Sequence, residues 1–191
     1  MPRFDFSKAH RLSVPAPAAV TFAALESYDI RESRTAQVLM FLRGYGRRVA
    51  RPDSPEGLVT SLTRSRFVHL GSRPGREHVF GLAGRFWTPD GGLRVVTADG
   101  FEEFAEQGCA KAAWNLAVEP AGEIASLVTT ETRILCFGNR ARRLFGLYWH
   151  TIELFSGAIR LSMLRGIRDR AVATDRAASP TLSSPLRKDV R

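Results

Sequence analysis

The sequence has few cysteines and no long apolar run. Only Cys109 and Cys136 are present among its 191 residues, which is too few for a disulfide-stapled fold. No stretch approaches the roughly 18 apolar residues of a membrane span. The N-terminal segment, MPRFDFSKAHRLSV, lacks the apolar core of a secretory signal. These absences predict a cytoplasmic protein without stable membrane insertion.

The sequence also lacks the motifs of the common catalytic and metal sites. Its four histidines, His10, His69, His78 and His150, do not have the spacing of a zinc-binding helix. Neither a G-x-S-x-G elbow nor a phosphate-binding loop occurs. We therefore expect no metal and no cofactor, and no motif identifies a catalytic residue. Whether the protein is an enzyme stays open, with a binding role favoured.

Positive charge is abundant, but lysine contributes little of it. The net charge is +9, and residues 139–191 hold eleven basic and four acidic residues. Nearly all the basic residues are arginines, the exceptions being Lys8, Lys111 and Lys188. A basic C-terminal region could contact nucleic acid or anionic lipid. No basic motif with interleaved aromatic residues supports a nucleic-acid partner, so we expect none.

The first third of the chain predicts one strand and several short helices. Residues 10–14 alternate as a strand does, and Pro15 and Pro17 precede a short helix over residues 18–27. Asp29 and Glu32 form a capping-box pattern for a second helix that ends at Gly44. Ser54-Pro55 begins a third helix that extends to about residue 62.

From residue 66 the hydrophobic period changes to two, which predicts strands. The expected strands cover residues 66–72, 77–87, 93–97, 109–119 and 123–136. Short turns rich in proline and glycine join them, which predicts an antiparallel meander. Residues 98–108 break the alternation and are expected to form a loop with a helical turn or an irregular strand.

Charge pairing predicts which face of this sheet is buried. If Glu119 lies opposite Glu123, Lys111 faces Glu131 and the odd positions point to solvent. Cys109 and Cys136 then face opposite ways and form no disulfide. The predicted inward residues are Phe67, His69, Phe80, Leu82, Phe86, Ala110, Ala112, Trp114, Leu116, Val118, Ile124, Val128, Thr130, Thr132 and Ile134.

Residues 139–170 predict one long helix that is apolar around much of its circumference. Phe145, Tyr148, Ile152 and Phe155 recur at three- and four-residue steps. At about 1.5 Å per residue, this helix exceeds an 11-residue strand in length, so a bend is expected at Ser156-Gly157. Residues 172–191 have no aromatic residue or periodicity and predict a disordered basic tail.

This order of elements resembles the START-like, or SRPBCC, superfamily, and local stretches do so too. Three parts of the sequence look like an uncharacterised, polyketide cyclase-like bacterial branch of this superfamily. They are RLSVPAPAAVTFAAL, REHVFGLAGRFWTPDGG, and LVTTETRI with RRLFGLYWHTIELFSGAIRLSMLRGI. The resemblance covers residues 9–171 as one domain. It implies an α+β helix-grip fold, in which a curved antiparallel sheet of six to seven strands wraps a long C-terminal helix.

The resemblance also implies an apolar cavity between the sheet and the last helix. The spacing alone leaves two alternatives, because small inward residues could leave space or simply interlock with large ones. The candidate ligand-pocket residues are His69, Phe80, Leu82, Phe86, Trp114, Thr130, Thr132, Tyr148, Ile152 and Phe155.

Three functions fit this sequence. The first is non-catalytic binding of a hydrophobic small molecule or lipid in that pocket. The second is a polyketide cyclase- or aromatase-like enzyme, in which His69 and Tyr148 would orient and protonate the substrate. The competing interpretation of His69 is a hydrogen-bonded histidine in the core or at its rim. The third is an interaction protein with a filled core, which could be a homodimer and whose exposed apolar residues contact a partner.

Overall fold

Six antiparallel strands and a long C-terminal helix make up most of the computed structural model, which describes residues 1–29, 56–64, 66–88 and 92–178. This architecture confirms the predicted α+β class. The elements are β1 Phe6–Val14, α1 Ala18–Glu26, α3 Leu58–Arg64, β2 Val68–Arg73, β3 Glu77–Gly84, β4 Leu93–Arg94, α4 Ala98–Glu103, β5 Ala110–Pro120, β6 Ser126–Cys136 and α5 Asn139–Ala178. The predicted helix between Asp29 and Gly44, and the predicted Ser54-Pro55 helix start, lie outside the described residues.

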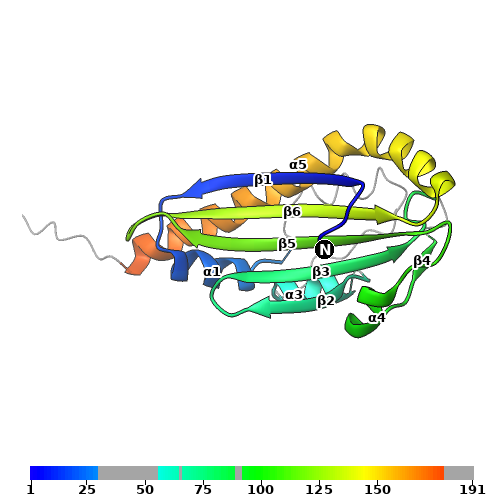
Figure 1. The fold of residues 1–191 in the computed structure, drawn as a ribbon. Coiled ribbons are helices and arrows are strands. Elements are labelled where there is room, and N and C mark those ends of the chain that lie inside the picture. Colours follow the sequence, from blue (N-terminus) through cyan, green and yellow to red (C-terminus); the bar gives the residue numbers. More distant parts are fainter. Residues whose placement is uncertain (30–55, 65, 89–91, 179–191) are drawn as a thin grey trace, which may run out of the picture.

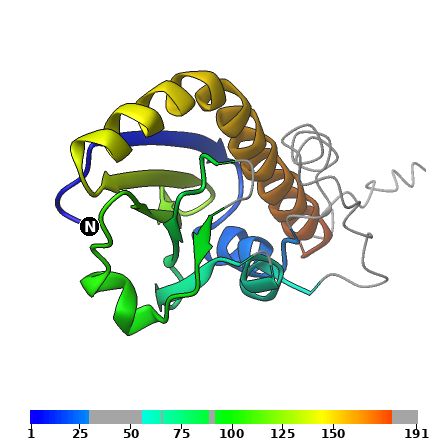
Figure 2. The ribbon, with the colours of Figure 1, turned by 90° about the vertical axis from the view of Figure 1, so that its right-hand side faces the viewer.

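The strands form one curved sheet with the order β1-β6-β5-β3-β2, and β4 pairs with β3. Every pairing is antiparallel. α1, α3 and the C-terminal half of α5 lie on one side of the sheet, which we call the inner face (Figures 1 and 2). On the other side, the outer face, α4 covers one corner near β2 and β3.

The predicted inner face is confirmed for β5 and β6, although the predicted pairing is wrong. Glu119 lies opposite Leu127 rather than Glu123, because the connection between the strands occupies residues 121–125 instead of a tight turn. The register therefore differs by four residues. An even shift leaves each side chain on its predicted face, and the even positions of β6 are all buried. Ile124 falls in the connection, is 81% exposed and is not an inner-face residue.

Lys111 points outward as predicted, but it does not lie in solvent or opposite Glu131. It lies opposite Leu135 and is buried beneath α4. Its Nζ donates to the carbonyl oxygens of Phe101 (3.1 Å) and Glu102 (2.7 Å), at the C-terminal end of α4. A cation is favourable at this end of a helix. Sequence spacing could not show that a helix would dock over this residue.

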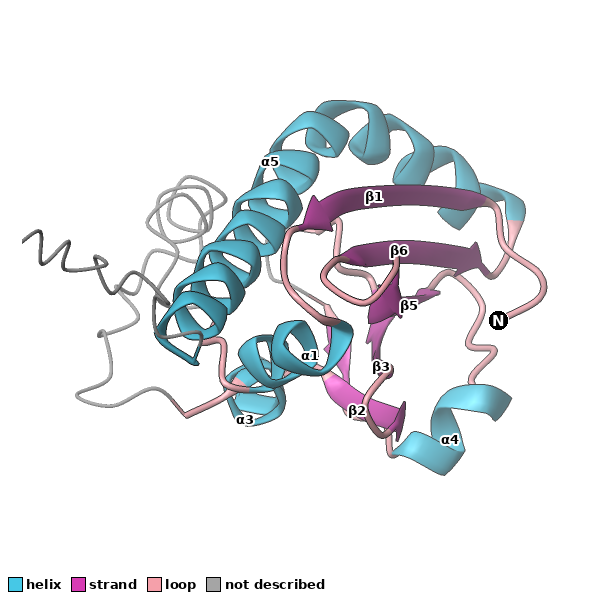
Figure 3. Cartoon of the chain, turned by 90° about the vertical axis from the view of Figure 1, so that its left-hand side faces the viewer, coloured by secondary structure: helices cyan, strands magenta, loops and turns pink. Residues whose placement is uncertain are grey.

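Helix α5 is longer than predicted and is bent. It continues to Ala178, so residues 172–178 of the predicted tail are helical, while residues 179–191 lie outside the described part. Figure 3 shows the helix passing over β1 and then turning toward α1 and α3. The crossing is close at Gly157, where an added Cβ would lie 3.3 Å from Cε1 of His10. A side chain at this position would require the His10 ring to shift by a few tenths of an ångström.

Buried apolar residues form two separate clusters between the sheet and the helices. The first cluster joins α1, α3 and the C-terminal half of α5 to the sheet, with Phe80, Leu116 and Ile167 fully buried. The second cluster lies at the other end, around Phe145 near the start of α5 and Phe86. Several edge-to-face ring pairs hold it together. Cys109 and Cys136 are both buried and free.

Candidate ligand-binding site

The middle of α5 is less buried than the segments on either side of it, around Phe145 and from Met163 to Ala171. Of the residues of α5, all of which the structure describes, Gly157 is the only buried one between Phe145 and Met163. Ile152 and Ile159 are partly exposed, and Phe155 is 51% exposed. Apolar side chains of this kind are normally covered in a finished core. The middle of the helix therefore leaves apolar surface that a bound molecule could cover.

Polar side chains gather on the inner face between the two clusters. We call His10, Trp114, Thr130, Thr132 and Arg160 the central polar group. Thr132 lies opposite Trp114, and Thr130 lies opposite His10 across β1 and β6. Nε1 of Trp114 donates to Oγ1 of Thr130 (2.5 Å), which donates to the carbonyl oxygen of Asn115 (2.7 Å). These bonds satisfy the buried indole N–H and fix the threonine rotamer.

Arg160 reaches into this group from α5. Its Nη1 donates to Oγ1 of Thr132, and its Nε lies 3.4 Å from Oγ of Ser156. Its guanidinium lies over the ring of Trp114, 5.5 Å from the centroid. Among the described residues, no carboxylate forms an ion pair with it. Burial lowers the pKa of Arg160 to about 10, which is the effect expected when a cation is removed from water without an anion.

His10 is the second titratable residue of the central polar group. Its Nε2 atom is buried and has no hydrogen-bond partner among the described residues. Burial lowers the pKa of His10, and the positive charges of Arg160 and Lys8 lower it further, against a smaller opposite effect of Glu153. The ring is therefore neutral at pH 7, with one nitrogen as a donor and the other as an acceptor.

The structure distributes the predicted pocket residues over this whole region. Phe80 and Trp114 belong to the first cluster, while Leu82, Phe86 and Tyr148 belong to the second. Thr130 and Thr132 lie between the clusters and are buried. Ile152 and Phe155 belong to neither cluster. The ten residues therefore do not form one compact lining.

His69 lies at the edge of the first cluster and has the polar partner that an acid–base role needs. Its Nε2 is 3.3 Å from Nδ1 of His78, whose Nε2 is 3.6 Å from a carboxylate oxygen of Glu26. The His78 ring stacks on Phe22 with an interplanar angle of 11°. Burial lowers the pKa of His78, and the adjacent His69 lowers it further, against a smaller raising effect of Glu26.

The sequence prediction missed two residues of the central polar group. Arg160 could have been found, because Gly157, Arg160, Leu164, Ile167 and Ala171 recur at three- and four-residue steps along the buried side of α5. A charged residue on that stripe is a signal of an interior charge. His10 depends on the pairing of β1 with β6, which no local pattern reveals.

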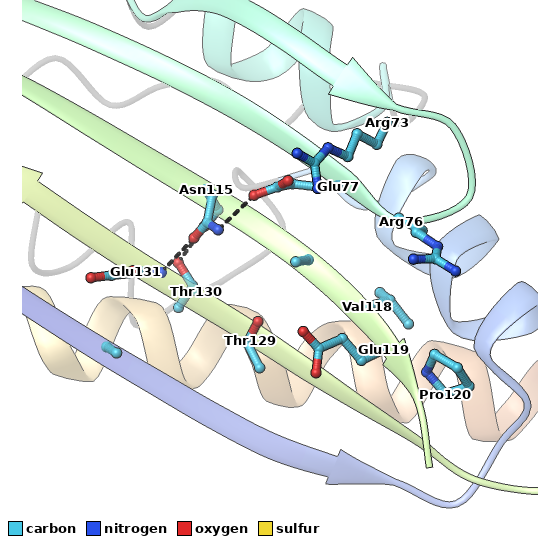
Figure 4. Close-up of a pocket in the computed structure, with 12 residues that line it drawn as sticks. Arg73, Arg76, Glu77, Asn115, Val118, Glu119, Pro120, Thr129, Thr130 and Glu131 are labelled. Atoms are coloured by element: carbon cyan, nitrogen blue, oxygen red, sulfur yellow. Dashed lines mark hydrogen bonds between the residues drawn. The ribbon is translucent and has the colours of Figure 1, made fainter. Parts of the chain in front are cut away.

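A groove of about 430 Å³ lies on the outer face and is a different kind of site. Figure 4 shows polar side chains from β2, β3, β5 and β6 around it. Asn115 donates to Glu77 (2.8 Å) and accepts from the backbone N–H of Glu131 (2.7 Å). The hollow follows from small residues such as Ala9 and Ala117. Its charged walls make it unsuitable for an apolar ligand.

The solvent side of α5 also carries apolar residues. Leu147 and Leu154 are 71% and 81% exposed. Exposed residues of this type favour contact with a partner, and self-association stays a prediction. In the described part of the chain, no helix combines the length and apolar character that crossing a bilayer requires. There too, no set of three metal-ligating side chains comes together.

Comparisons with known proteins find only solved structures of low similarity. No protein-family model and no curated protein sequence matches the chain. Zhui aromatase/cyclase from Streptomyces sp. R1128 aligns with a TM-score of 0.36 at 12% identity, over 92% of this chain and 99% of that one. A Thalictrum flavum norcoclaurine synthase point mutant gives 0.41 at 10% identity, over 88% and 95%. A protein from Thermus thermophilus gives 0.31 at 13% identity, over 88% and 99%.

The order and placement of the elements themselves decide the fold. Short helices follow the first strand, a curved antiparallel sheet comes next, and the last helix packs on its inner face. The chain has a helix-grip fold. This confirms the predicted fold class, but it does not identify the function, because one fold hosts many functions.

Proposed function

We propose that the protein binds a hydrophobic small molecule or lipid between the inner face and the middle of α5. The observation that carries this proposal is the interrupted burial of α5, whose central turns remain partly exposed between two buried clusters. Covering apolar surface contributes about 25 cal/mol per Å². A ligand placed there would complete the core that the side chains leave incomplete.

The inner face offers small side chains for such a ligand to lie against. Ala112 lies opposite Leu82 and Ile134, and both Ala112 and Leu82 are only partly buried. Tyr148 and Trp149 from α5 reach the same cluster. Apolar walls with a few polar groups are typical of small-molecule sites, and the central polar group supplies those polar groups.

The test is binding of a neutral apolar dye, N-phenyl-1-naphthylamine, followed by its fluorescence. Ala112→Leu adds volume on the inner face, whereas Ala117→Leu makes the same change at the outer-face groove. We expect Ala112→Leu to weaken dye binding at least several-fold and Ala117→Leu to leave it unchanged. If the wild-type protein does not bind the dye, or both variants bind equally well, the proposal is wrong.

A second candidate is an enzyme of the polyketide cyclase or aromatase kind. The observation that favours it is the chain of contacts from Glu26 through His78 to His69. A histidine oriented in this way can exchange a proton with a bound substrate. On a polyketone test substrate, His69→Ala should lower turnover while dye binding persists. Unchanged turnover would remove His69 from any catalytic role.

A further inference from the structure

We propose that the ligand is an amphiphile with a carboxylate, and that Arg160 and His10 hold this carboxylate at the central polar group. This inference rests on the proposed binding function. The apolar part of the ligand would lie toward Ala112 and Ile152. The proposal names the chemical class of the ligand and two binding residues.

Arg160 carries the first part of the argument. Its hydrogen-bond contacts among the described residues are the hydroxyl oxygens of Thr132 and Ser156, and neither is an anion. Burying a cation without an anion is unfavourable, and the contact with the Trp114 ring offsets only part of this. A guanidinium has five N–H donors in a planar fork that matches a carboxylate. A ligand carboxylate would supply the missing counter-charge.

His10 carries the second part. Its buried, unpaired Nε2 lies next to α5, because a Cβ on Gly157 would be 3.5 Å from it. Gly157 is three residues before Arg160, so the two lie on the same side of the helix. A neutral imidazole can donate its N–H to an anion. The burial of this ring and its neighbouring cations support the neutral form.

The surrounding charges favour an anion as well. The charged groups around His10 are Lys8 on its own strand and Arg160 and Glu153 on α5. Glu153 is already paired with Lys8 at 2.5 Å. The pair is neutral overall, so Arg160 leaves this part of the interface with a net positive charge. An anionic headgroup meets no unpaired carboxylate there among the described residues.

The test compares decanoate with 1-decanol as competitors of the bound dye at pH 7.5. The two have the same chain length and differ in the charged group. A charge-assisted hydrogen bond contributes about 1.5–3 kcal/mol, so we expect decanoate to bind the wild type roughly ten- to hundredfold more tightly than decanol. Arg160→Met should abolish this preference, so that decanoate and decanol compete for the dye equally well. Arg165→Met, at an exposed arginine of the same helix, should behave as wild type.

The outcomes separate the two proposals. If the dye and decanol bind but decanoate has no advantage, the carboxylate inference is wrong and the binding function stands. If Arg160→Met retains the preference, Arg160 is not the binding residue. If neither dye nor competitor binds, both proposals fail. The comparison of decanoate with decanol in the wild-type protein does not depend on any variant. If Arg160→Met does not fold, Arg160→Gln takes its place.

Discussion

The guanidinium of Arg160 lies 5.5 Å from the ring centroid of Trp114, so a charge from α5 lies over an aromatic side chain of β5. This contact joins the helix to the middle of the sheet, between the two apolar clusters. It also places a cation where a folded protein normally keeps none unpaired. We expect such a residue to lower the stability of the ligand-free protein, and under the carboxylate proposal it would bind the ligand's anionic group.

The first prediction concerns the stability of the ligand-free protein. Arg160→Met should raise the free energy of unfolding by about 1 kcal/mol, because an apolar side chain of similar length replaces a buried cation. Urea denaturation measures this. The exposed Arg165→Met control should stay within about 0.5 kcal/mol of wild type. A large loss of stability in Arg160→Met alone would show that the charge is satisfied inside the protein.

The second prediction concerns pH. Burial is the largest cause that lowers the folded-state pKa of His10 and of His78 below 6.5. The unfolded chain therefore binds these protons more readily, and stability falls as the pH drops through 6.5 toward the folded pKa values. Denaturation between pH 7.5 and 5 should show this loss. His78→Phe should reduce the change in the free energy of unfolding with pH, and His150→Gln, at an exposed position, should not. Equal pH dependence in the wild type and both variants would contradict the prediction.

The third prediction concerns the glycines of α5. An added Cβ at Gly166 would lie 2.6 Å from the ring of Tyr28, whereas at Gly146 the nearest atom is 3.5 Å away on Phe6. Gly166→Ala should destabilise the protein by about 1–3 kcal/mol through overpacking. Gly146→Ala should stabilise it by about 0.5–1 kcal/mol through helix propensity. Thermal unfolding of the two variants should thus shift in opposite directions; a shift in the same direction would contradict this packing.

The fourth prediction concerns the hydrogen bond between Trp114 and Thr130. Thr130→Val keeps the shape but leaves the buried indole N–H without its acceptor, which should cost about 1–3 kcal/mol. Thr129→Val changes the neighbouring residue on the outer face and should cost less than about 0.5 kcal/mol. Chemical denaturation monitored by tryptophan fluorescence compares the two. Equal losses would mean that the bond does not stabilise the fold.

The faces of the sheet could be predicted from the sequence, but the details of pairing could not. Alternation in β6 was strong enough to identify its buried side, and the four-residue error in register kept that side unchanged. Gly122 marks a turn in the connection at residues 121–125, but it does not set the length of that connection. The burial of Lys111 depends on where α4 docks, which is a tertiary contact.

The candidate site was only partly predictable for a similar reason. The inward threonines follow from strand alternation, and their partners come from α5 and β1. Arg160 lies on the buried stripe, but an arginine on a helix is more often a solvated residue. His10 faces Thr130 only because β1 pairs with β6, a strand that is distant from it in the sequence.

The position of the two clusters near the ends of α5 has a consequence for hydrogen exchange. Amide groups whose local surroundings are poorly buried open with a smaller free energy than those in a packed core. The central turns around Ile152 and Phe155 should therefore exchange their amide protons faster than those around Phe145 and Ile167. The helix then has a built-in site of local opening, through which a molecule could enter the interior while both ends of α5 stay folded.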